Sequence, residues 1–240
     1  MTIDDIQNEF ISTVSHELRT PLTSIRGFSQ TLLSSWDKLD DESKKKFVRI
    51  IDEQSNRLIN LVENILTVSK INSDKPIFRE VDVNSSIEKV IQMISQKYKD
   101  IKIATKFNNN IPFARLDNDK FQQIMTNLID NACKYSGEKK EVLVATAFAD
   151  SENVVITVKD FGVGIKEEDF TKVFEKFVRL ENHLTSKTQG NGLGLYITKN
   201  LVELMNGQIG VSSTPKEGSE FYVKFPFYNQ EEVMQCSLQS

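Results

Sequence analysis

The 240-residue sequence is poor in the residues that usually build metal and redox sites. Its two cysteines, Cys133 and Cys236, are far apart and lack CxxC spacing, so neither a zinc site nor a disulfide framework is expected. This cysteine usage fits a reducing compartment such as the cytoplasm. The only histidines are His16 and His183, so histidine chemistry has just two possible positions.

Long apolar runs and a surplus of basic charge are absent as well. No apolar stretch reaches the roughly 18 residues of a transmembrane helix, and the N-terminus lacks a signal-peptide pattern. We therefore expect a chain that neither spans a membrane nor is exported. The net charge of −4 favours neither nucleic acid nor anionic lipid. At 39% hydrophobic residues, the composition supports a packed core in one large domain or two small ones.

The first 72 residues carry two helical patterns separated by a polar segment at residues 34–41. Apolar residues spaced by three or four mark one face of each predicted helix. They are Ile6, Phe10, Val14, Leu18, Leu22, Ile25, Phe28 and Leu32, then Phe47, Ile50, Ile51, Leu58, Leu61, Ile65, Leu66 and Ile71. The two helices should form an antiparallel hairpin. One hairpin cannot bury both stripes, so we expect a homodimer with a four-helix bundle.

Residues 73–77 are predicted to be a linker, after which helical and strand patterns alternate up to residue 228. The patterns predict helices at 87–94, 120–135 and 194–205, and strands at 101–107, 113–116, 142–148, 154–158, 208–213 and 220–225. We expect 101–107 and 113–116 to flank one turn. The predicted fold is α+β multidomain, the hairpin followed by an α/β sandwich with one sheet covered on one face. The tail at 229–240 is polar and unassigned.

His16 is the residue of the first helix most suited to chemistry. The helical period places His16 and Thr20 on the side opposite the apolar stripe, so both should be exposed. The Glu17 carboxylate can accept the imidazole Nδ1–H, which leaves Nε2 free to attack an electrophile. Pro21 should bend the helix beside these residues. Taken alone, an exposed histidine on a helix is usually a solvated side chain; a phosphate donor elsewhere in the chain would change this interpretation.

A polar stripe on the predicted helix 120–135 contains Asn127, Asn131 and Lys134. Amide oxygens suit Mg²⁺, which is usually bound together with substrate phosphates, and lysine adds positive charge for those phosphates. Taken alone, the stripe is also what the solvent face of an amphipathic helix contains.

Two glycine-rich segments follow. Asp160 follows a predicted strand and can accept from an adenine amine, while Gly162 and Gly164 let the backbone approach the base. Gly190, Gly192 and Gly194 open a helix whose backbone amides form an anion site. Residues 178–189, between the two segments, are either a mobile lid or a plain surface loop. The tripeptide at 160–162 also matches the magnesium motif of Ser/Thr/Tyr kinases, but the other kinase motifs are missing, so the match is coincidental.

The motifs in this order resemble those of two-component sensor histidine kinases, over about residues 6–226. Residues 10–22 resemble the H box, 127–136 the N box, 160–165 the first glycine box, 174–177 the F box, 190–195 the second glycine box and 217–221 a weaker last box. The resemblance implies a dimerisation and phosphotransfer hairpin followed by a Bergerat-type ATP-binding domain.

The resemblance also implies roles for single residues. His16 would attack the γ-phosphate of ATP with Glu17 as general base, and Thr20 would orient water in dephosphorylating the regulator, unless it only eases entry into the Pro21 bend. Asn131 would bind Mg²⁺ with support from Asn127, while Lys134, Tyr135 and Arg179 would contact ribose or phosphates and Asp160 the adenine. The remaining nucleotide contacts would come from Gly162, Gly164, Gly190, Gly192, Leu193 and Gly194.

The partner implied by the resemblance is a response regulator, whose receiver aspartate takes the phosphoryl group. Family members often carry sensory and transmembrane segments before the hairpin, so the resemblance implies part of a membrane-anchored protein or a short form controlled by a partner. Two other functions remain open: an ATPase clamp that uses the hairpin only to dimerise, and a scaffold that binds no nucleotide.

Overall fold

The computed structural model describes residues 3–71, 74–180 and 190–227. The chain divides into two compact units with the boundary at Ser69–Lys70. Residues 74–78, within and just after the predicted linker, are neither helix nor strand. Residues 72–73 and the predicted tail at 229–240 lie outside the described part. None of the helices described is long and apolar enough to cross a membrane.

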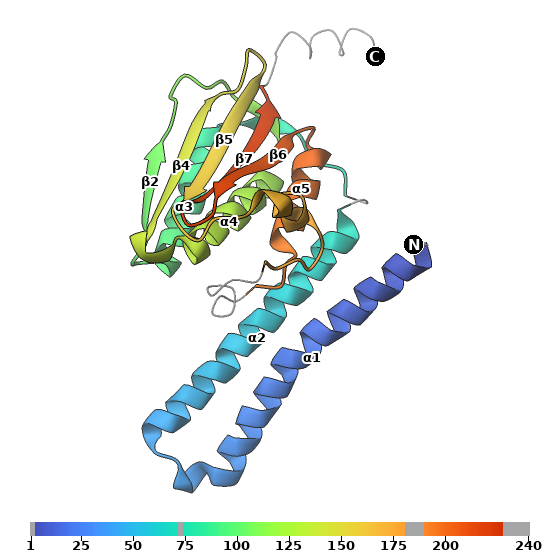
Figure 1. Ribbon diagram of the computed structural model, residues 1–240, viewed down its shortest axis with the longest axis vertical. Helices are drawn as coiled ribbons and strands as arrows, with labels where there is room; N and C mark the ends of the chain where they lie inside the picture. Colours follow the sequence, from blue (N-terminus) through green and yellow to red (C-terminus); the bar gives the residue numbers. More distant parts are fainter. Residues whose placement is uncertain (1–2, 72–73, 181–189, 228–240) are drawn as a thin grey trace. The chain divides into compact units, whose positions relative to one another are not determined.

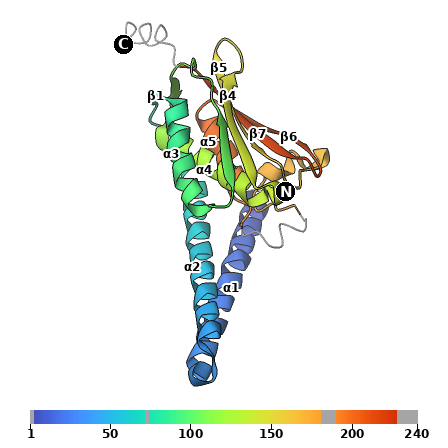
Figure 2. The same cartoon turned by 90° about the vertical axis from the view of Figure 1, so that its left-hand side faces the viewer.

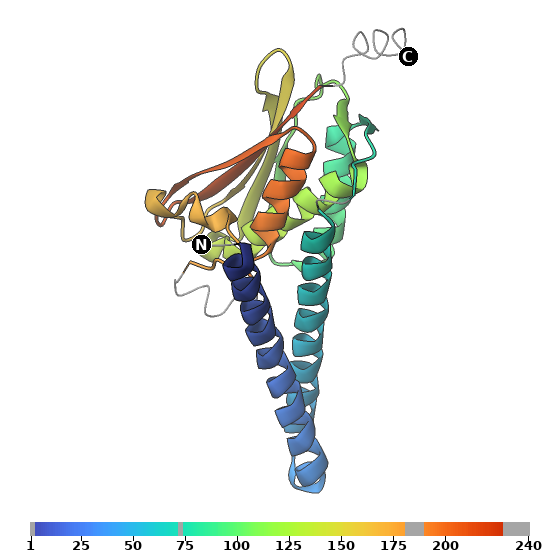
Figure 3. The ribbon, with the colours of Figure 1, turned by 90° about the vertical axis from the view of Figure 1, so that its right-hand side faces the viewer.

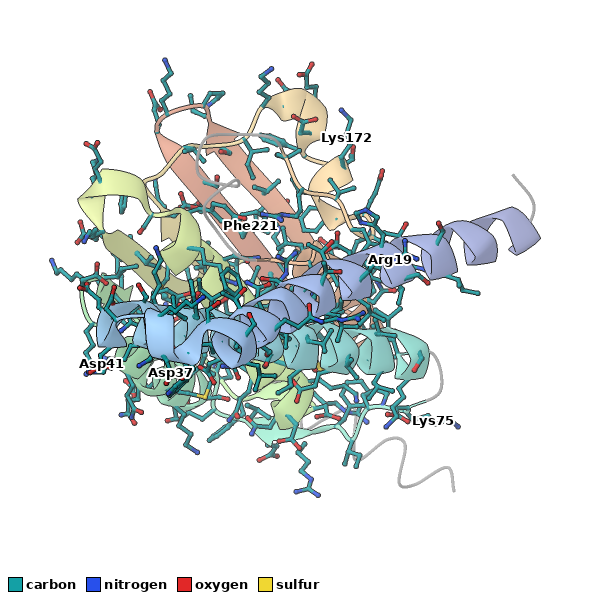
Figure 4. The ribbon with its side chains drawn as sticks, turned by 90° about the horizontal axis from the view of Figure 1, so that it is seen from below. Arg19, Asp37, Asp41, Lys75, Lys172 and Phe221 are labelled. Carbon is teal, nitrogen blue, oxygen red and sulfur yellow. The ribbon has the colours of Figure 1, made fainter. Side chains whose placement is uncertain are left out.

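The first unit is the predicted helical hairpin. Helix α1 (Ile3–Ser35) and helix α2 (Asp41–Lys70) run antiparallel and are joined by the 3₁₀ turn η1 (Trp36–Lys38), as Figure 1 shows. Asp37 and Asp41 mark this turn in Figure 4. Asp40 accepts the backbone N–H of Ser43 at 2.7 Å, a bond that lowers the pKa of its carboxyl. It therefore caps the start of α2.

The hairpin buries only part of its apolar surface. Phe28 and Phe47 pack across it with ring centroids 5.2 Å apart, and Pro21 is buried on the inner face of α1. Leu22, assigned by its spacing to this face, is instead 50% exposed, because Pro21 takes the inward position three residues after Leu18. Among the side chains described, from residue 11 onward, the large apolar residues that stay exposed on the hairpin helices are Ile11, Leu22, Leu33, Val48, Ile59, Val62 and Leu66.

The second unit contains a five-stranded sheet in the order β2-β4-β5-β7-β6. Its strands are β2 (Lys102–Lys106), β4 (Glu141–Phe148), β5 (Asn153–Asp160), β6 (Gln208–Thr214) and β7 (Gly218–Pro226). The β2–β4 pair is parallel and the other pairs are antiparallel. Side chains alternate between buried and partly exposed along β5, as expected for a sheet with one covered face.

Three helices cover one face of this sheet: α3 (Val83–Lys97), α4 (Asn118–Tyr135) and α5 (Gly194–Leu204), which Figures 2 and 3 show from opposite sides. Helix α4 packs against the sheet through Phe121, whose ring meets that of Phe225 edge-on at 5.9 Å. The fully buried residues between helices and sheet include Ile87, Phe121, Ile124, Leu128, Ile156, Ile197, Val223 and Phe225. The predicted α+β sandwich is confirmed.

The pairing of the short strands differs from the expectation. β3 (Ala114–Leu116) pairs antiparallel with β1 (Arg79–Val81), and β2 pairs with β4, so the strands expected around one turn do not pair with each other. β1 itself was not predicted. Its three residues include a single apolar one, Val81, so it has no alternating pattern to detect; contacts with β3 specify it.

Asp117 connects the residues that follow the predicted linker to the start of α4. Its buried side chain accepts the backbone N–H groups of Asp119 and Lys120 through Oδ1, each at 3.2 Å. Oδ2 accepts the backbone N–H of Ile77 at 2.9 Å. One carboxylate thus caps α4 and also holds the backbone at Ile77.

We predict that Asp117→Ala lowers the unfolding free energy of the second unit by about 2–3 kcal/mol, the sum of a lost helix cap and a lost buried hydrogen bond. Urea unfolding followed by circular dichroism measures the loss. Trp36, the sole tryptophan, reports by its fluorescence on the hairpin, which should unfold as in wild type.

The matched control is Asp119→Ala, since Asp119 is exposed in the same helical turn. We expect it to cost less than about 1 kcal/mol. Equal losses in the two variants would contradict the capping role of Asp117.

Candidate functional site

His16 lies on the outer face of α1, as predicted. It is exposed, and so is Thr20 one turn later, whose hydroxyl donates to the His16 carbonyl oxygen at 3.3 Å. Helix α1 continues through Pro21 without interruption. The imidazole can therefore be reached from solvent, which a nucleophile that acts on a second molecule or domain requires.

Glu17, next to His16 in sequence, lies in a different environment. Its carboxylate Oε2 is 3.3 Å from Nη2 of Arg57 on α2, and the two side chains are 28% and 23% exposed. The sequence places Glu17 beside His16 and gives no sign of Arg57. Hydrophobic periodicity gives the face of each helix but does not give the register of α2 against α1, so it could not reveal this pair.

Asn127 joins α4 to the start of α5. Its Nδ2 donates to the Gly194 carbonyl oxygen and to Oγ1 of Thr198, both at 3.3 Å. These bonds leave Oδ1 as an oxygen donor, and Asn131 lies one turn further along the same helix. The structure thus brings the N-box stripe to the second glycine segment, and it adds Thr198, which the sequence patterns did not single out.

Lys134 is held by Asp130, the residue four positions earlier, at 2.6 Å. Asp130 also accepts from Lys97 at 2.7 Å and from the Tyr98 hydroxyl at 2.9 Å. Burial raises the pKa of the Asp130 carboxyl, but Lys134 and Lys97 outweigh burial and leave the pKa below its ordinary value. Burial, together with this carboxylate, raises the pKa of Tyr98. Any contact of Lys134 with a phosphate therefore competes with Asp130.

Asp160 is a buried carboxylate at the end of β5, with 3% of its surface exposed. Its Oδ1 accepts the backbone N–H of Gly162 at 2.9 Å and that of Ser219 at 3.3 Å. Burial raises its pKa to about 6, although the two backbone bonds oppose the shift. Within the described residues both bonds end on Oδ1, so Oδ2 remains an acceptor for a ligand.

The predicted glycines have two different structural roles. A Cβ on Gly162 would overlap the Tyr135 carbonyl oxygen, and a Cβ on Gly164 that of Thr214; at Gly192 it would lie 2.6 Å from the Phe177 carbonyl carbon. The protein's own packing requires these three glycines. Gly190 has nothing within 4 Å in that direction, and Gly194 has only Asn127 Cγ at 4.0 Å. The start of α5 is therefore an open, backbone-lined site suited to an anion.

The other predicted residues lie around these segments. Leu193 is fully buried directly before α5, Tyr135 ends α4 with its carbonyl against Gly162, and Arg179 is exposed. His183 and most of the predicted lid, residues 181–189, lie outside the described part. The described residues contain no group of three His, Cys, Asp or Glu side chains that could hold a metal ion. The predicted Mg²⁺ site instead depends on the two asparagine oxygens.

We predict that Asp160→Asn stabilises the protein at pH 7. The folded-state pKa of about 6 exceeds the ordinary 3.8, so between these values the folded state binds more protons than the unfolded state. The unfolding free energy then falls as pH rises from about 4 to 6, by about 3 kcal/mol in all, and stays lowered above that. Asparagine keeps an oxygen for both amides and removes the buried charge. Urea unfolding at pH 4.5 and 7 should show a gain of up to this size at pH 7.

Asp150→Asn is the control, for which we expect a change in stability of the opposite sign. Asp150 is exposed, and its bonds to the Glu152 N–H and the Asn153 side chain lower its pKa. Its charged form is therefore stabilising, and the substitution should destabilise the protein at pH 7. Destabilisation by both variants would show that the buried Asp160 charge carries no cost.

Two family models match the chain. Residues 6–74 match the His Kinase A (phospho-acceptor) domain, and residues 116–229 match the histidine kinase-, DNA gyrase B- and HSP90-like ATPase. The first contains His16 and the second contains Asn127, Asp160 and Gly194. The two models thus divide the chain as the fold does, into a hairpin and an α/β sandwich.

A sensor protein kinase WalK from Staphylococcus haemolyticus is 36% identical over 223 residues, which are 92% of this chain and 36% of that protein. The chain thus spans about a third of the length of this relative. The structure of full-length ShkA in complex with AMPPNP superposes with a TM-score of 0.66 at 28% identity, covering 92% of this chain and 46% of that one.

The histidine kinase ThkA, solved in complex with the response regulator protein TrrA, has a TM-score of 0.74. At 23% identity, over 93% of this chain and 63% of that one, it supports the fold alone. The two domain matches and the sequence identity to the sensor kinase lead to one assignment. The chain belongs to the two-component sensor histidine kinases, of which it contains the phospho-acceptor hairpin and the ATPase-type domain.

Proposed function

We propose that this chain is an ATP-dependent protein-histidine kinase that phosphorylates His16 and passes the phosphoryl group to an aspartate of a response regulator. The observation that carries the proposal is an exposed histidine on a phospho-acceptor hairpin in the same chain as an ATPase-type site. Because ATP is a cytoplasmic metabolite, the proposal places this segment in the cytoplasm.

The nucleotide site is supported by three features of the second unit. The buried Asp160 keeps an acceptor oxygen for the adenine amine, and the open start of α5 at Gly194 offers backbone amides to phosphates. Asn127 and Asn131 would hold Mg²⁺, since amide oxygens are hard donors. The ion would neutralise phosphate charge. ShkA, similar over 92% of this chain, was solved with an ATP analogue.

In the proposed reaction, Nε2 of His16 attacks the γ-phosphorus, the bond from this phosphorus to the β–γ bridging oxygen breaks, and ADP leaves. The Nδ1 proton of the resulting cation passes to Glu17. The attacking atom and the leaving oxygen must be in line, so the unit that binds ATP has to bring the γ-phosphate to the exposed imidazole. The phosphoryl group then moves from Nε2 to the receiver aspartate, and Thr20 orients water when the regulator is dephosphorylated.

A second copy of the chain is the proposed partner of the hairpin. Leu33 is 85% exposed and Ile59 55%, and the other exposed apolar residues of α1 and α2 add to the uncovered apolar area. Two hairpins that pack into a four-helix bundle would bury these side chains. The homodimer would thereby place two copies of His16 on the outside of one bundle.

We predict that His16→Gln abolishes autophosphorylation, because it removes the attacking nitrogen. Wild-type protein incubated with Mg-ATP should acquire a phosphate that is labile in acid and stable in base, measured with radiolabelled ATP. His183→Gln is the matched control and should label as wild type. Full labelling of His16→Gln would exclude the proposed acceptor, and ATP turnover without phosphoprotein would indicate an ATPase clamp.

We further predict that Asn131→Asp weakens Mg²⁺-dependent binding of an ATP analogue by about tenfold or more, about 1.4 kcal/mol, because a carboxylate changes the charge beside the phosphates. Calorimetric titration with and without Mg²⁺ measures the effect. Asn118→Asp adds the same charge at the far end of α4 and keeps the acceptor oxygen that Ser86 uses, so binding should be unchanged. Equal affinity in wild type and Asn131→Asp would remove Asn131 from the site.

A further inference from the structure

An ion pair joins α1 to α2 directly beside the proposed phosphate acceptor. The two atoms in contact are Oε2 of Glu17 and Nη2 of Arg57, 3.3 Å apart. They form both an ion pair and a hydrogen bond, which Arg57 donates. Both residues belong to the first unit. Arg57 has no part in the reaction proposed above, yet it holds the group assigned there as the base.

The helix geometry makes the two partners of Glu17 compete. Consecutive side chains on an α-helix point about 100° apart and do not face each other. His16 is exposed, whereas the Glu17 side chain is 28% exposed and is bonded toward α2. A carboxylate held at Arg57 is turned away from the His16 imidazole. The contact uses Oε2 and leaves Oε1 as an acceptor, but bringing Oε1 to the imidazole requires the side chain to rotate toward His16, which takes Oε2 off the guanidinium.

The guanidinium suits this contact because its donors lie in a rigid plane that matches a carboxylate. The pair is also partly shielded, since only 23% of the Arg57 side chain is exposed. Shielding from solvent reduces screening, so the contact is stronger than a fully exposed one.

We propose that Arg57 is a positioning residue: it holds Glu17 against α2, and phosphorylation of His16 proceeds when Glu17 exchanges Arg57 for the Nδ1–H of His16. The inference rests on the proposed function. No covalent bond changes in this exchange; one hydrogen bond replaces another.

The exchange also separates the two activities of the hairpin. Phosphorylation needs Glu17 at His16, whereas dephosphorylation of the regulator through Thr20 does not use Glu17 as a base. The state with Glu17 on Arg57 therefore disfavours the kinase reaction alone. A displacement of α1 along α2 would change the distance between Glu17 and Arg57.

The test compares Arg57→Met, which keeps the long aliphatic stem and removes the charged donors, with two controls. We expect the initial autophosphorylation rate to rise about two- to fivefold, the range that loss of a partly exposed ion pair implies. Arg57→Lys keeps the charge and should stay near wild type. Arg49→Met removes an exposed arginine of the same helix and should leave the rate unchanged. A lowered rate in Arg57→Met would overturn the proposal.

A second measurement needs no ATP and so separates this inference from the proposed kinase activity. The chain has only two imidazoles, and ¹⁵N NMR of the 240-residue protein reports the tautomer of each, with His183→Gln assigning the signals. Arg57→Met should increase the fraction of His16 with its proton on Nδ1, because the freed Glu17 accepts it. An unchanged fraction would refute the exchange even in an active kinase.

The double variant Glu17→Ala/Arg57→Met distinguishes positioning from a structural effect. If Arg57 acts through Glu17, the change in the His16 tautomer disappears in this background. If it persists, Arg57 affects His16 through the fold and the proposal fails. Unphosphorylated wild-type protein would defeat the proposed function, while the NMR result would still decide whether Glu17 exchanges partners.

Discussion

The ends of α4, β5 and β7 meet around one carboxylate, Asp160, which the fold keeps out of water. A buried charge needs hydrogen-bond donors, and here they are the backbone N–H groups of Gly162 and Ser219. The backbone can turn back so closely only without side chains: a Cβ on Gly162 would overlap the end of α4, and a Cβ on Gly218 would overlap the Asp160 carbonyl oxygen. The Oδ1 oxygen thus meets the ends of α4, β5 and β7 at one point, while the buried charge costs stability. The adenine contact proposed for Oδ2 would account for keeping a carboxylate at this position.

Helix α4 connects the surroundings of Asp160 to the hydrophobic core. Its apolar face, including Phe121 and Leu128, is fully buried against the sheet, so the helix cannot rotate without exposing that face. The opposite stripe is therefore fixed, and Asn127 extends from it to the start of α5. Asp117 anchors the first turn. Site residues on a packed helix keep their geometry. The glycines around them allow neighbouring backbone segments to approach closely.

Periodicity predicted the long elements because their faces are repeated over many residues. It identified α1, α2, α4 and α5, the β4–β5 hairpin and the exposed side of His16. It did not predict β1, the buried position of Pro21 or the partners of Glu17 and Lys134. Periodicity gives the face of one helix, whereas Arg57 contacts Glu17 from 40 residues away in the sequence. Asp130 is close to Lys134 in the sequence, but periodicity does not show that the two side chains form an ion pair. The order of the motifs indicated the family. Motifs identify residues, but they do not show which other residues these contact.

The hairpin holds His16, the proposed nucleophile, and Glu17, the proposed base, in separate environments, although they are neighbours in sequence. His16 faces solvent, where a phosphate donor can reach it, and Glu17 faces α2, where a cation holds it. A partly exposed ion pair contributes at most about 1 kcal/mol, which corresponds to roughly a fivefold change in population. The restraint on Glu17 is therefore weak enough for a small displacement of one helix to reverse it. A stronger, fully buried ion pair would hold Glu17 at Arg57 permanently. A fully solvated ion pair would be too weak to link the position of Glu17 to α2.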